Sequence, residues 1–413
     1  MKNSEKFSAL YFRDFRLFWF GQLISLSGTW MQSVAQGWLV YSLTKSPFYL
    51  GIVAAASTLP ILLFTLIGGI IADRFRKRNL IILTQVLSIM PALLLGILTD
   101  LNIITVYQVI ALAFFLGTVN AFDMPARQSF LVEMVGKGHL LNAIALNSAA
   151  FNGARIIGPV IAGLAIAYLG LPACFYINAA SFVAVIIALS LIKNRGEITA
   201  TSKGFLKDIS EGFNFIKAQK DILYMIILIS VFSLFGIPFT SFLPVFAEEI
   251  FQSGPRGLGL LVSATGLGAF SAAMILAIKS DIKNKKRYMS VSAICFSIAL
   301  LAVSISKVFW LSLIFLVFAG WGIVSFLATA NSFIQLSAPD NLRGRVISVY
   351  SLVFLGFTPI GNFLIGILSH SFKTTNAVSV SALICIIASI LFSVSDSRQP
   401  SHKNNAGIPM PRL

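Results

Sequence analysis

Residues 115–163 read FLGTVNAFDMPARQSFLVEMVGKGHLLNAIALNSAAFNGARIIGPVIAG, and a related pattern returns at residues 318–366. Nine residues recur 203 positions later: Phe115, Gly117, Ser129, Phe130, Ser148, Phe151, Gly153, Gly158 and Gly163 become Phe318, Gly320, Ser332, Phe333, Ser351, Phe354, Gly356, Gly361 and Gly366. A second set recurs 208 positions later: Pro47, Leu50, Gly51, Asp73 and Lys77 become Pro255, Leu258, Gly259, Asp281 and Lys285. The sequence therefore predicts that the chain consists of two related halves.

The composition of this internally repeated chain predicts a protein embedded in lipid. Hydrophobic residues make up 57% and charged residues 11%, against roughly 25% charged in soluble domains. Apolar stretches of the length that crosses a bilayer occupy residues 17–43, 47–72, 79–98, 104–132, 139–168, 171–192, 221–247, 256–279, 288–306, 309–337, 343–370 and 375–395. We expect an all-α integral membrane protein with twelve transmembrane helices in two pseudo-symmetric six-helix halves. Many secondary transporters place one site between two such halves.

The distribution of positive charge predicts the orientation in the membrane. A net charge of +16 could suggest nucleic acid as a partner, but 25 of the 31 Lys and Arg residues fall on one side of the predicted helices. The opposite side holds four: Lys45, Arg256, Lys307 and Lys373. Because positive residues accumulate on the cytoplasmic side, we expect both termini in the cytoplasm and no nucleic-acid partner.

The predicted spans divide the chain into four parts. These are an N-terminal six-helix bundle at 1–192, a cytoplasmic linker at 193–220, a C-terminal six-helix bundle at 221–395 and a disordered cytoplasmic tail at 396–413. In the linker, Leu206, Ile209, Phe213 and Ile216 fall three and four residues apart, which predicts an amphipathic helix on the membrane surface.

Two short motifs favour close contacts between helices. At the cytoplasmic end of the second span, Gly68-Gly69-Ile70-Ile71-Ala72-Asp73-Arg74 is followed by a basic cluster. We expect Gly69, Asp73 and Arg74 to form a latch between the halves, with a weaker equivalent at Asp281, which Ile282 and not Arg follows. The second motif is Ala154-Arg155-Ile156-Ile157-Gly158-Pro159, whose small residues permit tight packing and whose proline bends the helix.

A third motif is Ala121-Phe122-Asp123-Met124-Pro125-Ala126-Arg127-Gln128-Ser129-Phe130. Together the three motifs resemble the major facilitator superfamily, and the third is similar to the branch that includes the enterobactin exporter and related bacterial secretion and multidrug-type exporters. The resemblance spans roughly residues 1–395. It implies a multi-pass protein of the bacterial inner membrane that works by alternating access. The motif around Gly158 and Pro159 resembles the exporter-associated signature of the superfamily, which implies an antiporter.

Three charged residues, Asp123, Arg127 and Arg155, lie well inside the predicted spans, away from their ends. Asp123 and Arg127 are four residues apart on one helix face and can pair, either as a structural pair or as a proton-coupling group. Asp123 is the carboxylate that we expect to take up and release a proton. Arg155 is a candidate for binding an anionic group of a substrate, or for pairing with Asp123 across helices. Charges within the membrane cost on the order of 3 kcal/mol, so they indicate function.

Polar residues at helical spacing predict the cavity wall. Those of the first span run three and four apart, so they share one stripe; a stripe this continuous should face water or substrate, unless it makes hydrogen bonds between helices. The predicted substrate cavity comprises Gln22, Ser25, Thr29, Gln32, Gln36, Asn152, Arg155, Ser233, Trp321, Ser325, Thr329 and Thr358. Trp30 is a candidate aromatic wall.

The predicted function is export of a small amphipathic molecule by proton antiport, the molecule being a siderophore, a metabolite or a drug-like compound. No phosphate-binding loop, metal-ligand cluster or catalytic constellation is visible in the sequence, so we expect no enzyme activity, no metal and no cofactor. The expected partners are the small-molecule substrate, protons and the lipid bilayer, and we expect a monomer. An uptake symporter on the same fold and a non-transporting membrane sensor or scaffold are the alternatives.

Overall fold

The computed structural model describes residues 8–193, 213–279, 282 and 284–397, and within these ranges the regular elements are all helical. The predicted latch residue Asp281 lies outside the described residues, as do most of the linker 193–220 and most of the tail 396–413. Eleven helices in the described part are long and apolar enough to cross a membrane, which agrees with the predicted all-α membrane fold.

The helices of the first half follow one another with short connections. A short 3-10 helix at Ser8–Tyr11 precedes α1 (Arg13–Thr44), α2 (Pro47–Arg74), α3 (Lys77–Asp100), α4 (Val106–Leu169) and α5 (Leu171–Leu191). The long α4 contains two of the predicted spans. Its direction changes at Gly136, whose φ of 70° lies in the region that favours glycine.

The helices of the second half begin with an irregular segment. α7 (Lys220–Val231) continues through a π turn at Phe232–Gly236, a 3-10 turn at Ile237–Phe242, α8 (Leu243–Val245) and a second π turn at Phe246–Ile250. Pro238 and Pro244 lack the N–H group that a regular helix needs, which accounts for the irregularity. Regular helices follow: α9 (Gly254–Ile278), α10 (Lys285–Ile305), α11 (Phe309–Ser337), α12 (Asp340–Phe372) and α13 (Thr374–Ser397).

The first predicted span, 17–43, lies in α1, which is not among the eleven helices that meet the membrane-crossing criteria. Its 32 residues correspond to a length of about 48 Å, more than a bilayer core requires. Its polar stripe, which includes Gln22, Gln32 and Gln36, lowers its apolar character. The same residues that predicted a cavity wall are therefore the reason why α1 does not meet the membrane-crossing criteria that the other spans meet.

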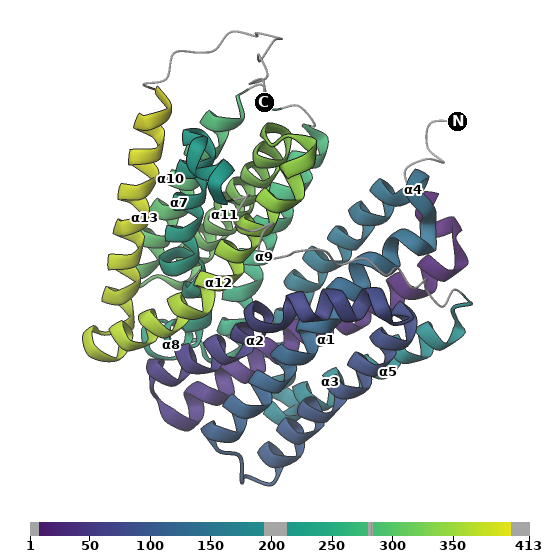
Figure 1. Cartoon of the computed structure of the whole chain (residues 1–413). Coiled ribbons are helices and arrows are strands. Elements are labelled where there is room, and N and C mark those ends of the chain that lie inside the picture. The colour runs from purple at the N-terminus through teal and green to yellow at the C-terminus, as the bar shows by residue number, and fades with distance from the viewer. Residues whose placement is uncertain (1–7, 194–212, 280–281, 283, 398–413) are drawn as a thin grey trace.

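The helices gather in two groups that follow the duplication (Figure 1). Helices α1 to α5 lie together and α7 to α13 lie together. The start of α1 and the end of α13, which we call the described termini, lie at the same end of the molecule. The groups meet mainly through α4 against α9 and α2 against α12. They match the predicted halves, whose boundaries as separate domains stay a prediction.

Contacts between the two groups are concentrated at the end opposite the described termini. Lys45 pairs with Glu248 at 3.2 Å, and the Tyr41 hydroxyl donates a hydrogen bond to Glu249. Two glycines allow backbones to touch nearby: a Cβ on Gly51 would lie 2.5 Å from the Asn362 carbonyl oxygen, and a Cβ on Gly259 would lie 2.4 Å from the Pro159 carbonyl oxygen. Gly51 and Gly259, which recur in the sequence, therefore both lie at contacts between the halves.

Candidate functional site

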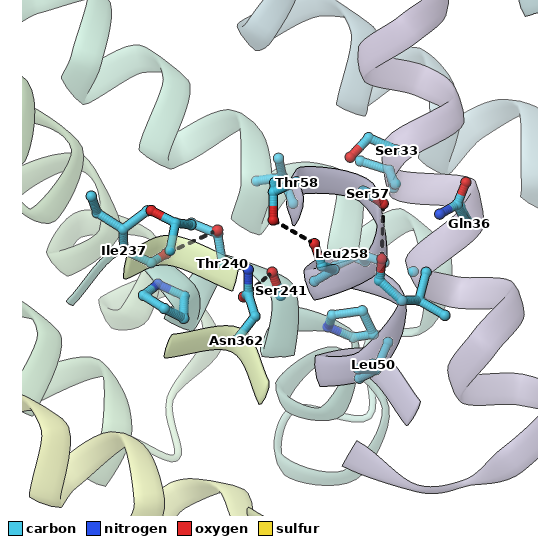
Figure 2. A pocket seen from close by; sticks show the side chains of 18 of the residues that line it. Ser33, Gln36, Leu50, Ser57, Thr58, Ile237, Thr240, Ser241, Leu258 and Asn362 are labelled. Carbon is cyan, nitrogen blue, oxygen red and sulfur yellow. Dashed lines mark hydrogen bonds between the residues drawn. The ribbon is translucent and has the colours of Figure 1, made fainter. Parts of the chain in front are cut away.

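A cavity of about 290 Å³ lies between the two groups of helices. Its wall combines residues of α1 and α2 with residues of the 3-10 turn at Ile237–Phe242 and of α12 (Figure 2). An adjoining pocket of about 140 Å³ shares Ile237 and Thr240 with it. We call the two together the central cavity. Irregular backbone at membrane depth is tolerated where it lines a cavity, which fits the position of the 3-10 turn.

The hydroxyl groups of the larger pocket face the cavity as acceptors. Ser57 and Thr58 donate to the carbonyl oxygens of Val53 and Ala54 on their own helix, at 2.8 and 2.9 Å. Across the wall, Ser241 donates to Asn362 at 3.0 Å (Figure 2). Since a hydroxyl carries one proton and two lone pairs, these side chains can still accept hydrogen bonds from a bound molecule.

Arg155 lines the smaller pocket of the central cavity, with Phe239, Phe296 and Phe354 among its neighbours. Its guanidinium carbon lies 5.4 Å from the centre of the Trp30 ring, within the range of a cation–π interaction. Its Nε atom is buried and has no hydrogen-bond partner among the described residues. No carboxylate lines either pocket, so the central cavity has one positive group.

A second cavity, of about 390 Å³, lies inside the first half and contains Asp123 and Arg127. Asp123 is only 7% exposed. Arg127 donates to its Oδ2 atom through Nε, and Gln85 donates to Oδ1 at 3.2 Å. The pairing of Asp123 is therefore with Arg127 on its own helix and not with Arg155. We call this the N-half cavity.

Thr84 gives the Asp123 carboxylate a partner for either protonation state. Its hydroxyl lies 2.5 Å from Oδ1 of Asp123 and 2.8 Å from the carbonyl oxygen of Ile81. One hydroxyl proton serves one of these acceptors at a time. An ionised Asp123 accepts from Thr84, whereas a protonated Asp123 can donate to Thr84 while the hydroxyl turns to Ile81.

The polar stripe of α1 is divided between several environments. Gln22, Ser25 and Thr29 line the N-half cavity, and Gln36 lines the central cavity. Gln32 is buried instead and accepts a hydrogen bond from Asn178 at 2.6 Å. The expectation of one continuous cavity wall is therefore too simple, because α1 is long enough to pass two cavities and to contact α5 between them.

The predicted cavity residues of the other helices are divided similarly. Thr358 lines the central cavity. Asn152 donates to the Ser148 carbonyl oxygen at 2.8 Å, one turn earlier. Ser325 accepts from the Tyr288 hydroxyl at 3.1 Å, and the Trp321 ring packs against the Tyr288 ring.

Two further predicted residues, Ser233 and Thr329, are buried in the second half. Ser233 belongs to the π turn that follows α7. Asn152, Ser233, Trp321, Ser325 and Thr329 are absent from the linings of the central and N-half cavities. Their role in substrate binding stays a prediction.

The latch motif lies at the end of α2 that is nearest the described termini. Asp73 is half-buried, Arg74 is exposed, and a Cβ on Gly69 would meet nothing within 4 Å. Its neighbour Gly68 makes the close helix contact, against the Ala121 backbone of α4. Lys77, which belongs to the basic cluster after the motif, is 2% exposed and pairs with Glu133 at 2.7 Å.

The second small-residue motif contacts helices on both sides. A Cβ on Gly158 would lie 2.7 Å from the Ser27 carbonyl oxygen of α1, within the first half. The carbonyl oxygen of the next residue, Pro159, faces Gly259 of α9 in the second half. This part of α4 therefore joins the two halves at the end opposite the described termini.

Several cavity residues were missed by the sequence reasoning. Ser57 and Thr58 of α2 and Asn362 of α12 line the central cavity, while Gln85 and Ser88 of α3 line the N-half cavity. A polar group inside the apolar 79–98 span was a usable signal, because Thr84, Gln85 and Ser88 fall within little more than one turn. Isolated residues such as Asn362 carry no such pattern.

These observations define a class: a multi-pass membrane protein whose two groups of helices enclose a cavity. A family model described as transmembrane secretion effector matches residues 4–411, and the chain belongs to this family. The expected resemblance is thereby confirmed.

Curated relatives match nearly the whole chain. The staphyloferrin A transporter of Staphylococcus aureus is 26% identical over 401 residues, covering 95% of this chain and 99% of that protein. The multidrug efflux pump Tap of Mycolicibacterium fortuitum is 28% identical over 362 residues, covering 85% of this chain and 88% of that protein.

Solved structures share the fold at low sequence identity. A bacterial homologue of the human lysosomal transporter Spinster, solved in an inward-facing and unoccupied conformation, superposes with a TM-score of 0.73 at 13% identity and covers 94% of this chain and 97% of its own. A POT family transporter in complex with 5-aminolevulinic acid gives 0.77 at 12% identity, covering 94% and 96%. These likenesses show the fold alone.

Proposed function

We propose that this protein exports a small amphipathic molecule from the cytoplasm by alternating access, in exchange for protons. The observation that supports this most is the central cavity, which lies between the halves and takes its wall from both. A site that two halves share changes its exposure when the halves rock against each other. The substrate is a siderophore, a metabolite or a drug-like compound.

The direction of transport rests on two arguments. One relative is named a multidrug efflux pump. In addition, the distribution of Lys and Arg favours cytoplasmic termini, so the end at which Lys45 meets Glu248 is the external end. With that end closed, the conformation is the one from which an exporter loads its substrate.

Proton coupling is assigned to Asp123. It is the carboxylate in the N-half cavity, and its hydrogen-bond partner Thr84 can serve both the ionised and the protonated form. Arg127 pairs with the ionised form, so protonation of Asp123 releases a partly buried positive charge from its partner. That change in charge pairing is a physical means by which a proton can alter helix packing in this half.

The proposal is tested by flux into inside-out membrane vesicles. We expect radiolabelled amphiphiles to accumulate when the vesicle lumen is acidic, and we expect Asp123→Asn to remove the dependence on the pH gradient while substrate exchange persists. Full proton dependence in that variant would exclude Asp123 as the coupling group. Accumulation only in right-side-out vesicles would indicate an uptake symporter.

A non-transporting sensor or scaffold makes a different prediction. Cysteines at positions 45 and 248, joined by a cross-linker, would hold the external end closed. We expect this cross-link to stop flux and a reducing agent to restore it. A biological activity that survives the cross-link would favour the sensor or scaffold.

A further inference from the structure

We propose that the central cavity selects an anionic amphiphile, whose carboxylate or other anionic group binds Arg155 and whose apolar body lies against the aromatic wall of the second half. This inference rests on the proposed function and specifies its substrate class. The juxtaposition that carries it is one unpaired guanidinium beside Phe239, Phe296 and Phe354, in a cavity with no carboxylate on its wall.

The charge of Arg155 lacks a partner among the described residues. The ion pairs Lys45–Glu248, Lys77–Glu133, Arg127–Asp123 and Lys286–Asp221 involve other cations. The Nε atom of Arg155 is buried without a hydrogen bond. A buried charge without a counter-charge is unfavourable. An anion that enters the cavity can therefore pair with the positive charge of Arg155 and accept hydrogen bonds from its unoccupied N–H donors.

Trp30 fixes the position of the guanidinium group. The ring lies 5.4 Å from the guanidinium carbon, and a second aromatic contact, with Phe151 at 5.8 Å, holds the ring itself. An arginine stacked on one aromatic face keeps its hydrogen-bonding edge free, and that edge matches the two oxygens of a carboxylate. A cationic ligand would meet like charge in the same place.

The apolar part of the site comes from the other half of the molecule. Phe239 belongs to the irregular segment after α7, Phe296 to α10 and Phe354 to α12, whereas Arg155 belongs to α4. The approach is close because Gly266 of α9 lies against the Arg155 backbone, where an added Cβ would be 2.9 Å from the carbonyl oxygen. Movement of the halves would therefore separate the cation from the aromatic wall and weaken binding of an anionic amphiphile.

The experiment measures binding, which needs neither flux nor a proton gradient. The probes are 2-naphthoate, its methyl ester and 2-naphthylmethylammonium, which share one aromatic body and differ in charge. Equilibrium binding to the full-length protein in lipid nanodiscs should favour the carboxylate over the ester by tenfold or more, as a charged hydrogen-bonded pair would give. The ammonium probe should bind more weakly than the ester.

Variants assign this preference to Arg155. Arg155→Gln should reduce the ratio of ester to carboxylate dissociation constants to about one, and Arg155→Lys should restore part of it. Arg256→Gln is the matched control, because Arg256 also stacks on an aromatic ring, Tyr168 at 4.6 Å, but lies outside the central cavity. It should leave the ratio unchanged.

Equal binding of ester and carboxylate to the wild-type protein would overturn the proposal without any variant. A ratio that survives Arg155→Gln in a monodisperse protein would overturn it as well. The proposed export function would be rejected separately if a protein that still prefers the carboxylate showed no proton-driven flux. If the ester is transported normally and the carboxylate is not preferred, the proposed export function stands and the anionic substrate class is rejected.

Discussion

Alanine at Gly259 should open the end of the protein at which Lys45 meets Glu248, which is the external end in the proposed orientation. In the described conformation, a Cβ at this position would lie 2.4 Å from the Pro159 carbonyl oxygen, and ordinary contact begins at about 3.4 Å, so the two helices would have to separate by about 1 Å. Because the obstructing atom is backbone, no side chain can move aside. Alanine at Gly51 meets the Asn362 carbonyl oxygen in the same way.

The expected effect follows from the cost of overpacking, which is about 1–3 kcal/mol. That cost falls on the conformation in which the halves touch here and not on one in which they separate. The population ratio should therefore shift about 5- to 150-fold toward the externally open form. Alanine also favours a helix over glycine by about 1 kcal/mol, but this gain applies in both conformations.

Spin labels at Asn102 and Lys307 provide the measurement. Both are exposed, they lie in connections at the external end, and they belong to different halves. In a background without the three native cysteines, pulsed electron resonance should show that a larger fraction of Gly259→Ala and Gly51→Ala molecules has a long distance between the labels. Gly153→Ala is the control, since a Cβ there meets nothing within 4 Å. Distance distributions identical to this control would refute the steric reasoning.

Three further predictions concern polar contacts. Arg127→Gln should destabilise the protein by about 3 kcal/mol because it leaves the buried Asp123 unpaired, and the added change Asp123→Asn should recover most of the loss in a thermal unfolding experiment. Tyr41→Phe should shift the label distances toward the open form by about fivefold, the effect of losing a partly exposed hydrogen bond of about 1 kcal/mol. Gln32→Leu should cost about 0.6 kcal/mol, typical of a hydrogen bond between membrane helices, and should leave flux unchanged; a large loss of flux without destabilisation would place Gln32 on the substrate path.

Much of the fold could be predicted because membrane helices leave strong patterns. Apolar length predicted the spans, and the repeated residues predicted the two halves. That two of the repeated glycines, Gly51 and Gly259, make contacts between the halves was not predicted. The irregular course of residues 232–250 was not predicted. Pro238 and Pro244 were visible in the sequence, but whether a proline bends a membrane helix or interrupts it depends on the neighbours that satisfy the freed carbonyl groups.

The sites were harder to predict than the fold. Spacing placed Gln22 and Gln36 on one stripe, but spacing along a helix does not tell which neighbour a residue meets at each depth. The structure places Gln22 in one cavity, Gln36 in another and Gln32 against Asn178. The pairing of Asp123 with Arg127 was predictable because both lie on one helix, whereas Thr84 and Gln85 come from a different helix.

The single charge of Arg155 also bears on the electrical behaviour of the transport cycle. With an anion bound, the site is neutral, so its reorientation moves no charge across the membrane. The empty site carries one positive charge, and its return toward a negative cell interior is favoured by up to about 2.3 kcal/mol per 100 mV. Membrane potential would therefore accelerate the return of the substrate-free protein, which in the proposed antiport is also the step that carries the proton inward, and the rate of export would depend on voltage through that step.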